Sequence, residues 1–410
     1  MTRPIAGISI ALFVYALLAA LLPLLVQLLI LPVEAEANAI AMIFWIGVLL
    51  LGAHYASPRD PEKTAELENP LAGFRTALAF TAVALAVGFI LYADALRGPF
   101  LGGDWSMIAR AEALDNAHGL GEALRLLFMP ARGVDYHGPL DQLTWWVQYR
   151  VWGTNPAPYR VFNLLLHVFN SVLLLRLAAR VLRGRTSALI AAGLFVLSPL
   201  AIECVVWVSA RKDLLGVFFL VATLNTYLRH REKHSRLLGW ASLGLFVLGL
   251  LSGTLVTLTP IVLFVGEGAG FFPIDETAEA RRRSRRELMT FATLALVFFA
   301  IWIAARGPSP IPPFADAIDF IGVRVPNQLF VPLYANVGPF DPIDKLSVAG
   351  LVLMVVLLSG VTSRGESRSI LLALLMIVIG AAAPFLFDDE PSASAGWRPL
   401  YLPALGFALL

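Results

Sequence analysis

The chain has 410 residues, of which 58% are hydrophobic and only 15% are charged, and its mean hydropathy is +0.75. Soluble chains average about 45–50% apolar and about 25% charged residues, so the surplus apolar surface predicts a membrane protein. The net charge of +2 gives no sign of a nucleic-acid partner, and the single cysteine, Cys204, excludes an internal disulfide and a cysteine metal cluster.

Apolar runs of about 20 residues, the length that crosses a bilayer as a helix, recur along the chain. We expect spans at 5–31, 38–55, 74–94, 159–181, 186–207, 213–229, 236–251, 254–268, 288–305, 346–363 and 369–388. The predicted fold class is therefore all-α, a polytopic helical bundle of about 11–12 spans. The last apolar run, 400–410, is too short to span, which favours a polypeptide that continues beyond Leu410.

Basic residues set the expected orientation, because Lys and Arg are retained on the cytoplasmic side. With Arg3 inside, the basic segments at 181–186, 229–236, 281–286 and 363–368 also fall inside. We therefore expect a cytoplasmic N-terminus. The preference for Arg over Lys and the many alanines favour a GC-rich bacterial genome, so the predicted location is a bacterial inner membrane.

Two long segments, 95–158 and 306–345, face outward in this orientation. The first carries four tryptophans and apolar residues at helical spacing, which is typical of helices lying at a membrane surface. The second begins with the proline-rich GPSPIPP, where we expect irregular structure. We divide the chain into a hairpin of two spans with a cytoplasmic linker, 1–73, and a main membrane domain, 74–410.

Asp104 follows the third predicted span, within the sequence GPFLGGDWSM. A carboxylate at the outer interface can act as a general base toward an acceptor hydroxyl when a cleft holds it. The alternative is a solvated loop acid beside the turn at Gly102 and Gly103, and such turns are common in loops.

Two further polar sets lie beside or within the spans. Tyr136 and His137, in VDYHGPLDQLTWW, offer hydrogen bonds and aromatic contact to sugar hydroxyls, or belong to an ordinary interfacial loop. Asn163 and His167 are four residues apart and so share one helix face. Polar groups inside a membrane face the bundle interior, and hydrogen bonding between helices is the simpler interpretation of this pair.

The stretch SPLAIECVVWVSARKDLL places charges at the expected outer end of two spans. Glu203 lies near the end of one span, and Arg211 and Lys212 lie outside it, against the orientation bias of basic residues. Their spacing suits a phosphate, with Arg as a fork, Lys as a point charge and Asp213 holding one of them in place. The alternative is a local ion-pair cluster near lipid headgroups.

Four segments carry a resemblance to a known family. They are YRVWGTNPAPYRVFNLLLHVFNSVLLL, LSPLAIECVVWVSARKDLLGVFFLVATLNTY, LGLLSGTLVTLTP and RPLYLPALGFALL, in this order. In order and spacing they resemble the transmembrane and tetratricopeptide-repeat O-mannosyltransferase-like proteins and their bacterial relatives. That family lies within the GT-C superfamily of membrane glycosyltransferases that use polyprenyl-phosphate sugars. The resemblance covers roughly 77–410, and implies a GT-C-like helical bundle.

The resemblance implies a cleft on the outer face. An acid of the first large loop is the base, which maps to Asp104, and basic residues bind the phosphate of the lipid-linked donor. Arg211, Lys212 and Arg398 match those basic positions. The supporting residues are Glu203, Asp213, Tyr136, His137, Asn163, His167 and Tyr401. The donor implied is a polyprenyl-phosphate sugar; no metal ligand is assigned, and a need for a divalent ion stays open.

The chain departs from the family at several polar positions. The family has two or three adjacent acids where this chain has Gly102, Gly103 and Asp104, and a Lys where it has Gly253. Where the family has His-Pro-x-His, this chain has Ser-Pro-Leu-Ala at 198–201. Trp145 stands at the position of a histidine that is common in the helix after the first large loop. Because losing a general base costs about 10²–10⁴ in rate, these changes weigh against full activity.

Two hypotheses follow from the sequence. The first is a glycosyltransferase that uses a polyprenyl-phosphate sugar and an acceptor on the outer face. The second is a catalytically degenerate protein of the same fold that serves as a scaffold subunit of a membrane complex. Membrane lipids are expected partners in both cases, the polyprenyl-phosphate lipid in the first and other proteins in the second. A transporter is disfavoured, because no paired broken helices occur in matching halves.

Overall fold

The computed structural model describes residues 70–128, 138–182, 185–268, 278–306, 372–373, 375–377, 379–380 and 401–409. These ranges contain helices, turns and bends, and no strand. The α-helices are α3 (Pro70–Leu91), α4 (Ala93–Leu96), α5 (Asp104–Asp115), α6 (Leu120–Phe128), α7 (Pro139–Trp152), α8 (Pro156–Val181), α9 (Arg185–Val196), α10 (Ile202–Val206), α11 (Arg211–Lys233), α12 (Arg236–Leu250), α13 (Thr259–Gly268), α14 (Ala278–Arg306) and α19 (Tyr401–Leu409). The same described ranges also contain three short 3₁₀ helices, η2 (Pro199–Ala201), η3 (Val208–Ala210) and η4 (Thr254–Leu258).

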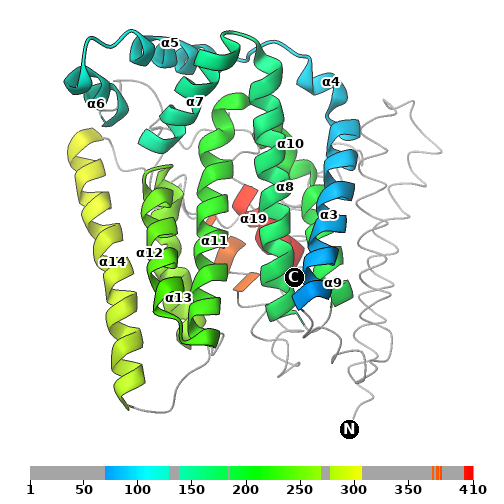
Figure 1. The fold of residues 1–410 in the computed structure, drawn as a ribbon, viewed down its shortest axis with the longest axis vertical. Helices are drawn as coiled ribbons and strands as arrows, with labels where there is room; N and C mark the ends of the chain where they lie inside the picture. The colour runs from blue at the N-terminus through cyan, green and yellow to red at the C-terminus, as the bar shows by residue number, and fades with distance from the viewer. Residues whose placement is uncertain are drawn as a thin grey trace, which may run out of the picture.

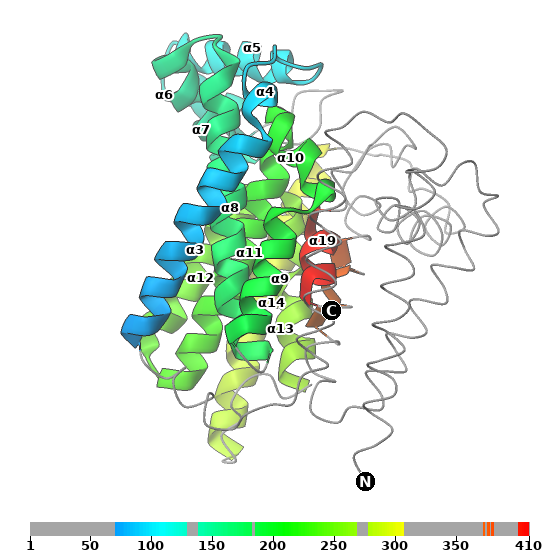
Figure 2. The same cartoon turned by 90° about the vertical axis from the view of Figure 1, so that its right-hand side faces the viewer.

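The long helices α3, α8, α11, α12 and α14 run side by side along the longest axis of the molecule (Figure 1). Helices α5, α6 and α7 gather at one end of them, which we call the α5–α7 end (Figures 1 and 2). This arrangement agrees with the expectation that the loop at 95–158 contains short helices; its residues 129–137 lie outside the described ranges.

The opposite end of the bundle holds the basic segments, and we call it the basic end, defined by residues 229–236 and 281–286. Here the Arg180 Nε of α8 lies 3.2 Å from the Glu232 Oε1 of α11, and the His230 Nε2 lies 3.1 Å from the Glu287 Oε2 of α14. Segments that the sequence predicts on one side of the membrane therefore come together at one end of the molecule.

The main core lies between α8, α9 and α11 and extends to α12 and α19. Leu174, Phe195, Leu220, Phe246 and Tyr401 are among its fully buried members. Burying each of these side chains contributes about 1.5–3 kcal/mol relative to exposure in water. Helix α11 is buried along most of its length and so forms the centre of the bundle.

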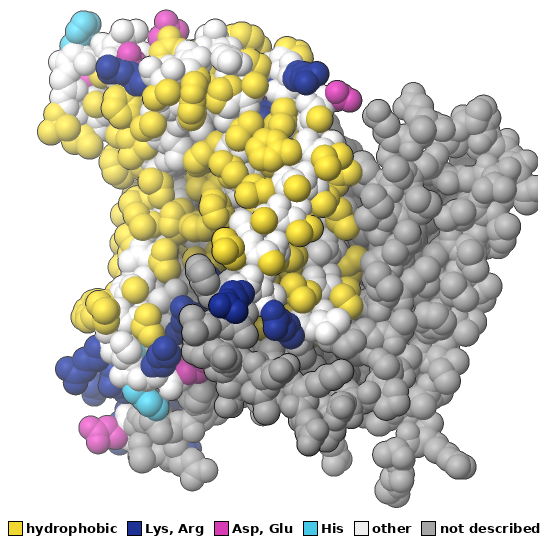
Figure 3. Space-filling model, turned by 45° about the vertical axis from the view of Figure 1, so that its right-hand side comes forward, with side chains coloured by type: hydrophobic (Ala, Val, Ile, Leu, Met, Phe, Trp, Pro, Cys, Tyr) yellow, Lys and Arg dark blue, Asp and Glu magenta, His cyan; other side chains and the backbone are white. Residues whose placement is uncertain are grey.

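Apolar side chains cover the outer surface of the described bundle between its two ends. Figure 3 shows this band on one face, with the charged side chains toward the ends. Two helical segments, Pro156–Val181 and Arg281–Ala304, are long and apolar enough to cross a membrane. Shorter apolar helices lie at Arg75–Leu91, Arg185–Val196, Arg236–Leu250 and Thr254–Gly268.

Two predicted spans are divided in the structure. The run 254–268 consists of η4 followed by α13, which has 10 residues. The apolar run 186–207 was expected to be one continuous helix, but α9 ends at Val196, and η2 and α10 follow as separate short helices. Pro199 has no N–H group to donate and disfavours helical geometry in the preceding residue, so the helix stops before it. The break produces the corner that is described below.

A close backbone contact fixes helix α7 against the end of α12. The Leu140 N–H donates to the Leu251 carbonyl oxygen at 2.8 Å. A Cβ atom at Gly138 would lie 2.3 Å from that same oxygen, so only glycine permits the approach. Helix α7 then begins with Pro139 at its first position, where a missing N–H costs nothing.

The remaining predictions of chain organisation fall outside the described residues. They are the spans at 5–31, 38–55 and 346–363, the hairpin unit 1–73 apart from its last residues, and the loop 306–345 beyond residue 306; the span 369–388 is described only at scattered positions.

Candidate functional site

The corner between α9 and α11 comprises residues 198–213 and lies at the α5–α7 end. It consists of η2, α10 and η3, and leads directly into α11 at Arg211. The Trp207 N–H donates to the Glu203 carbonyl oxygen and the Ala210 N–H donates to that of Trp207, which keeps the corner compact. The corner therefore presents a fixed set of backbone groups to its neighbours.

Asp104 joins helix α5 to this corner. One carboxylate oxygen, Oδ1, accepts from the Ser209 N–H at 2.8 Å, and the other, Oδ2, accepts from the Leu101 N–H at 2.9 Å. The side chain is fully buried. Two segments about a hundred residues apart in sequence are thus brought together, as the predicted site requires, although Asp104 is a bound acid rather than a solvated one.

Burial raises the pKa of the Asp104 carboxyl above its ordinary value of 3.8. The backbone hydrogen bonds from Leu101 and Ser209, and then the guanidinium of Arg160, oppose this rise but do not cancel it. A carboxylate with a raised pKa accepts a proton more readily, which is the property that a general base needs.

Arg160, which the sequence analysis did not single out, holds the backbone around Asp104. Its guanidinium donates to the carbonyl oxygens of Gly98 and Pro99 and, at 2.9 Å, to that of Val206. The side chain is buried at the start of α8. Arg211 was singled out because it is a basic residue at an end expected to lie outside. The same argument applies to Arg160.

Arg211 is fully buried and hydrogen-bonded within the protein. Its Nε donates to Asn163 Oδ1 at 3.0 Å, its Nη1 to Thr144 Oγ1 at 3.1 Å and its Nη2 to the Tyr159 carbonyl oxygen at 3.4 Å. These partners come from α7 and α8, so the guanidinium connects three helices.

Aromatic rings surround the same guanidinium. Its central carbon lies 4.8 Å from the ring centroid of Trp145, 4.9 Å from that of Phe162 and 5.7 Å from that of Tyr159. Trp145 is only 1% exposed. Trp145, which stands where the resemblance places a common histidine, is thus one of three rings that cover Arg211, and in this conformation the fully buried guanidinium is closed to a phosphate.

Glu203, Lys212 and Asp213 are half-buried, in contrast to Asp104 and Arg211. Lys212 is therefore the basic side chain of the corner with the better access to a ligand. A Cβ atom at Gly253 would lie 3.6 Å from the Lys212 carbonyl oxygen, which is ordinary contact distance. The position where the family carries a lysine thus lies beside Lys212.

Asn163 and His167 both make hydrogen bonds between helices. The amide nitrogen of Asn163 donates to the corner carbonyl oxygens of Cys204, Trp207 and Val208 at 3.2–3.4 Å. The His167 Nδ1 lies 2.8 Å from the Tyr401 hydroxyl, which also accepts from Asn170 at 3.1 Å. These two helix α8 residues thus belong to two clusters, one at the corner and one around Tyr401.

Asn170 was missed in the sequence analysis, although it lies three residues after His167 and extends the same polar face of α8. Its amide nitrogen also donates to the Leu214 carbonyl oxygen at 3.0 Å and so ties α8 to α11. Tyr136, His137 and Arg398 lie outside the described residues.

The described chain is thus an all-helical protein with two helices fit to cross a membrane and an acid–arginine corner at one end. Among its described residues, no group of three or more His, Cys, Asp or Glu side chains is arranged to hold a metal ion. This class of protein includes membrane enzymes and their non-catalytic relatives.

Comparison with known proteins narrows the class. The chain is 31% identical to Protein O-mannosyl-transferase Tmtc1 of Drosophila melanogaster over 215 residues, which is 51% of this chain and 24% of the fly protein. It is 22% identical to Protein O-mannosyl-transferase F38B6.6 of Caenorhabditis elegans over 301 residues, 66% of this chain and 41% of the nematode protein. It is 29% identical to Protein O-mannosyl-transferase TMTC3 of Homo sapiens over 109 residues, 27% of this chain and 12% of the human protein.

No family model and no solved structure matches the chain. The chain spans less than half the length of these relatives. The similarities support a glycosyltransferase-like protein related to those named O-mannosyltransferases. The relatives are animal proteins, so the bacterial origin expected from composition stays a prediction.

Proposed function

We propose that this chain is a membrane glycosyltransferase of GT-C type that moves a sugar from a polyprenyl-phosphate carrier to a hydroxyl acceptor at the α5–α7 end. One observation carries the proposal: in a chain similar to proteins named O-mannosyl-transferases, Asp104 is bonded to the corner that also holds Lys212. The names of those relatives make mannose the first sugar to test.

In the proposed reaction, the acceptor oxygen attacks the anomeric carbon of the sugar. The bond from that carbon to the phosphate oxygen breaks, the electron pair leaves with the phosphate, and Asp104 takes the proton of the acceptor hydroxyl. Lys212 neutralises the phosphate, because it is half-buried and accessible, whereas Arg211 positions the corner through its internal contacts. Glu203 and Asp213 support the same corner.

The proposal includes a polytopic arrangement in a bacterial inner membrane, with a cytoplasmic N-terminus and the α5–α7 end outside. The apolar band of Figure 3 supports insertion in a membrane, and the separation of the basic end from the α5–α7 end supports an outward-facing α5–α7 end. The bacterial membrane and the cytoplasmic N-terminus are predictions from the sequence.

The second candidate is a catalytically degenerate protein that acts as a scaffold subunit of a membrane complex. A specific observation favours it: both oxygens of Asp104 already accept backbone hydrogen bonds, and Trp145 covers Arg211. In that case the buried acid and guanidinium lock the corner, and they serve no substrate.

Assay of the purified full chain with polyprenyl-phosphate mannose and a hydroxyl acceptor separates the two candidates. For an active enzyme we expect transfer, a loss of about 10²–10⁴ in rate for Asp104→Asn, and a raised donor KM with a small change in kcat for Lys212→Gln. Absence of transfer by a folded wild-type chain, together with co-purification in a larger assembly, would favour the scaffold subunit.

The assay separates the two candidates better when the chain carries the polar groups that the resemblance implies, an acid at position 103 and a lysine at position 253. Gly103 is exposed, and a Cβ atom there would lie 3.5 Å from Ser209 Oγ, so Gly103→Asp fits without strain. Gly253→Lys places its Cβ atom 3.6 Å from the Lys212 carbonyl oxygen, which is ordinary contact distance, at a buried position. A degenerate chain should gain transfer in the double variant, whereas Gly103→Ala and Gly253→Ala, which add a Cβ atom but no polar group, should leave transfer at the wild-type level.

A further inference from the structure

A cavity of about 1040 Å³ lies at the basic end, far along the bundle from the corner, between α11, α12 and α14. The residues that decide its chemistry are Arg236, Trp240, Arg282, Arg283, Arg286 and Glu287. Ligand sites in proteins commonly occupy about 300–1,000 Å³, so this volume is larger than a small inorganic anion requires.

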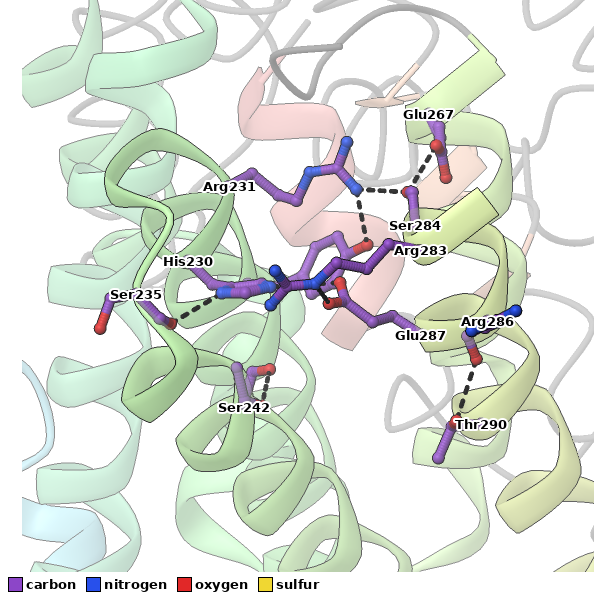
Figure 4. A network of polar contacts seen from close by, with 12 residues as sticks. His230, Arg231, Ser235, Ser242, Glu267, Arg283, Ser284, Arg286, Glu287 and Thr290 are labelled. Atoms are coloured by element: carbon purple, nitrogen blue, oxygen red, sulfur yellow. Dashed lines mark hydrogen bonds and ion pairs between the residues drawn. The ribbon is translucent and has the colours of Figure 1, made fainter. Parts of the chain in front are cut away.

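The lining of the cavity is positively charged. It contains four arginines against two glutamates, Glu279 and Glu287. Glu287 is already neutralised, because one oxygen lies 3.1 Å from the His230 Nε2 and the other accepts from the Arg283 Nε at 3.1 Å (Figure 4). Once the paired Arg283 and Glu287 are set aside, three arginines and one glutamate remain in the lining, so its remaining charge is positive.

Three arginines remain for an external anion. Arg236, Arg282 and Arg286 are exposed, and the structure shows no ion pair between them and any other described residue. They come from two helices, with Arg236 at the start of α12 and the other two in the second and third turns of α14. Guanidinium groups converging from separate helices form a fork for phosphate oxygens.

Apolar side chains lie in the lining beyond the arginines, beside the polar Ser242 and Thr290. Trp240 is 71% exposed, and Leu243 and Phe291 continue the lining away from the charged rim. The outward surfaces of α12 and α14 next to the cavity are also apolar, with Leu237 77% and Met289 57% exposed. From the helix ends inward, the cavity therefore presents arginines, then Trp240, then apolar side chains. This order matches the charged headgroup, the interfacial region and the acyl chains of a phospholipid at the edge of a bilayer.

We propose that this cavity binds an anionic phospholipid of the leaflet at the basic end. Arg236, Arg282 and Arg286 hold the phosphate and the anionic headgroup, and Trp240 and Leu243 contact the beginning of the acyl chains. The bound lipid links α12 to α14. This site does not depend on the function proposed for the corner.

The test uses the full chain in neutral detergent, titrated with phosphatidylglycerol, phosphatidylcholine or inorganic phosphate. Native mass spectrometry counts bound lipid, and the shift of the thermal unfolding midpoint gives an apparent affinity. We expect phosphatidylglycerol to bind in a saturable way and to stabilise the protein, with phosphatidylcholine at least about tenfold weaker and inorganic phosphate without a saturable shift.

The variant Arg282→Gln/Arg286→Gln should weaken phosphatidylglycerol binding by about tenfold to thirtyfold. Its matched control is Arg281→Gln/Arg285→Gln, which removes the same charge from the same helix turns but from residues outside the cavity lining. We expect the control to keep binding within about twofold of the wild type. Trp240→Ala should weaken lipid binding without creating a response to inorganic phosphate.

Four results would each overturn the proposal. They are equal losses in the two double variants, equal binding of the anionic and zwitterionic lipids, a saturable response to inorganic phosphate that matches that of the lipid, and unchanged lipid binding in Trp240→Ala. The first would mean diffuse attraction to the basic end, and the third would mean a site for a free anion.

Discussion

At the scale of single residues, the buried cations at the α5–α7 end hold the protein together. Arg160 binds three backbone carbonyl groups, and Arg211 binds Asn163, Thr144 and the Tyr159 backbone. A buried charge is tolerated only when its donors are satisfied, and here the carbonyl and amide oxygens satisfy them. Basic residues on an unexpected side of a membrane therefore mark structural anchors as well as ligand sites.

The first prediction concerns the shape of the Arg211 side chain. Arg211→Lys keeps the charge but loses the planar fork that reaches three acceptors, so we expect it to lower the free energy of unfolding by about 2 kcal/mol. Thermal unfolding in detergent measures the loss. Lys212→Arg, one residue along and half-buried, is the control and should change stability by less than about 0.5 kcal/mol. Equal stability of Arg211→Lys and the wild type would contradict an internally bound guanidinium.

The second prediction concerns the pH dependence of stability at Asp104. Because burial raises the pKa of this carboxyl above 3.8, the folded protein holds the proton more tightly than the unfolded chain does. Its contribution to stability is present below the ordinary pKa and is lost as the pH rises through the raised pKa. The stability of the wild type minus that of Asp104→Asn should therefore fall as the pH rises from the ordinary pKa of 3.8 through the raised pKa.

The measurement is the unfolding midpoint of both proteins over that range of pH. The control is Ser106→Ala, in the same helix turn, which removes a group that does not titrate. Its unfolding midpoint should depend on pH in the same way as that of the wild type. A difference that grows as the pH rises would mean that the Asp104 carboxylate is stabilised by the fold.

At the scale of elements, breaks and close approaches position the site. The helix of the apolar run 186–207 stops before Pro199, which creates the corner, and Gly138 lets α7 reach the end of α12. Helices α11 and α12 also approach closely at Gly249, where a Cβ atom would lie 2.7 Å from Val256 Cγ1 and 2.8 Å from Phe219 Cβ.

The third prediction compares two glycines of helix α12. Gly249→Ala forces α11, α12 and η4 apart and should destabilise the protein by about 1–3 kcal/mol. Gly244→Ala meets no atom within 4 Å, so it should stabilise the helix by about 0.5–1 kcal/mol in a water-like reference. Thermal unfolding of the two variants under the same conditions checks both signs. Stabilisation of equal size at both positions would show that helix propensity, and not packing, governs α12.

At the scale of the whole molecule, charge and shape divide the bundle into two ends. The basic segments meet at one end, and α5, α6 and α7 cover the other (Figure 1). An apolar band lies between them (Figure 3). This division is what a bilayer imposes on a helical protein, because charged groups are costly within hydrocarbon.

The fourth prediction uses the single cysteine of the chain. Cys204 is buried, so the wild type should resist a membrane-impermeant maleimide. In intact cells the reagent should label Ala113→Cys on α5, and should label Lys233→Cys at the end of α11 only after permeabilisation. Both positions are exposed in the structure. Labelling of both variants in intact cells, or labelling of Lys233→Cys alone, would contradict the proposed orientation.

The sequence by itself determined the helical class, the approximate positions of α3, α8, α11, α12 and α14, and the sorting of basic segments to one end. Hydrophobic length and charge placement are local properties, and helices form from local contacts, so these features can be predicted from a single chain. The polar face of α8 was also visible, because residues four apart share a helix face.

Only the tertiary structure decided what those polar groups touch. That Asp104 is bonded to Ser209, that Trp145 covers Arg211, and that Arg160 holds Gly98 and Pro99 all depend on segments between 61 and 105 residues apart. The cavity at the basic end likewise needs three helices to meet. Such contacts depend on how helices pack, which burial of the whole core fixes and no local pattern records.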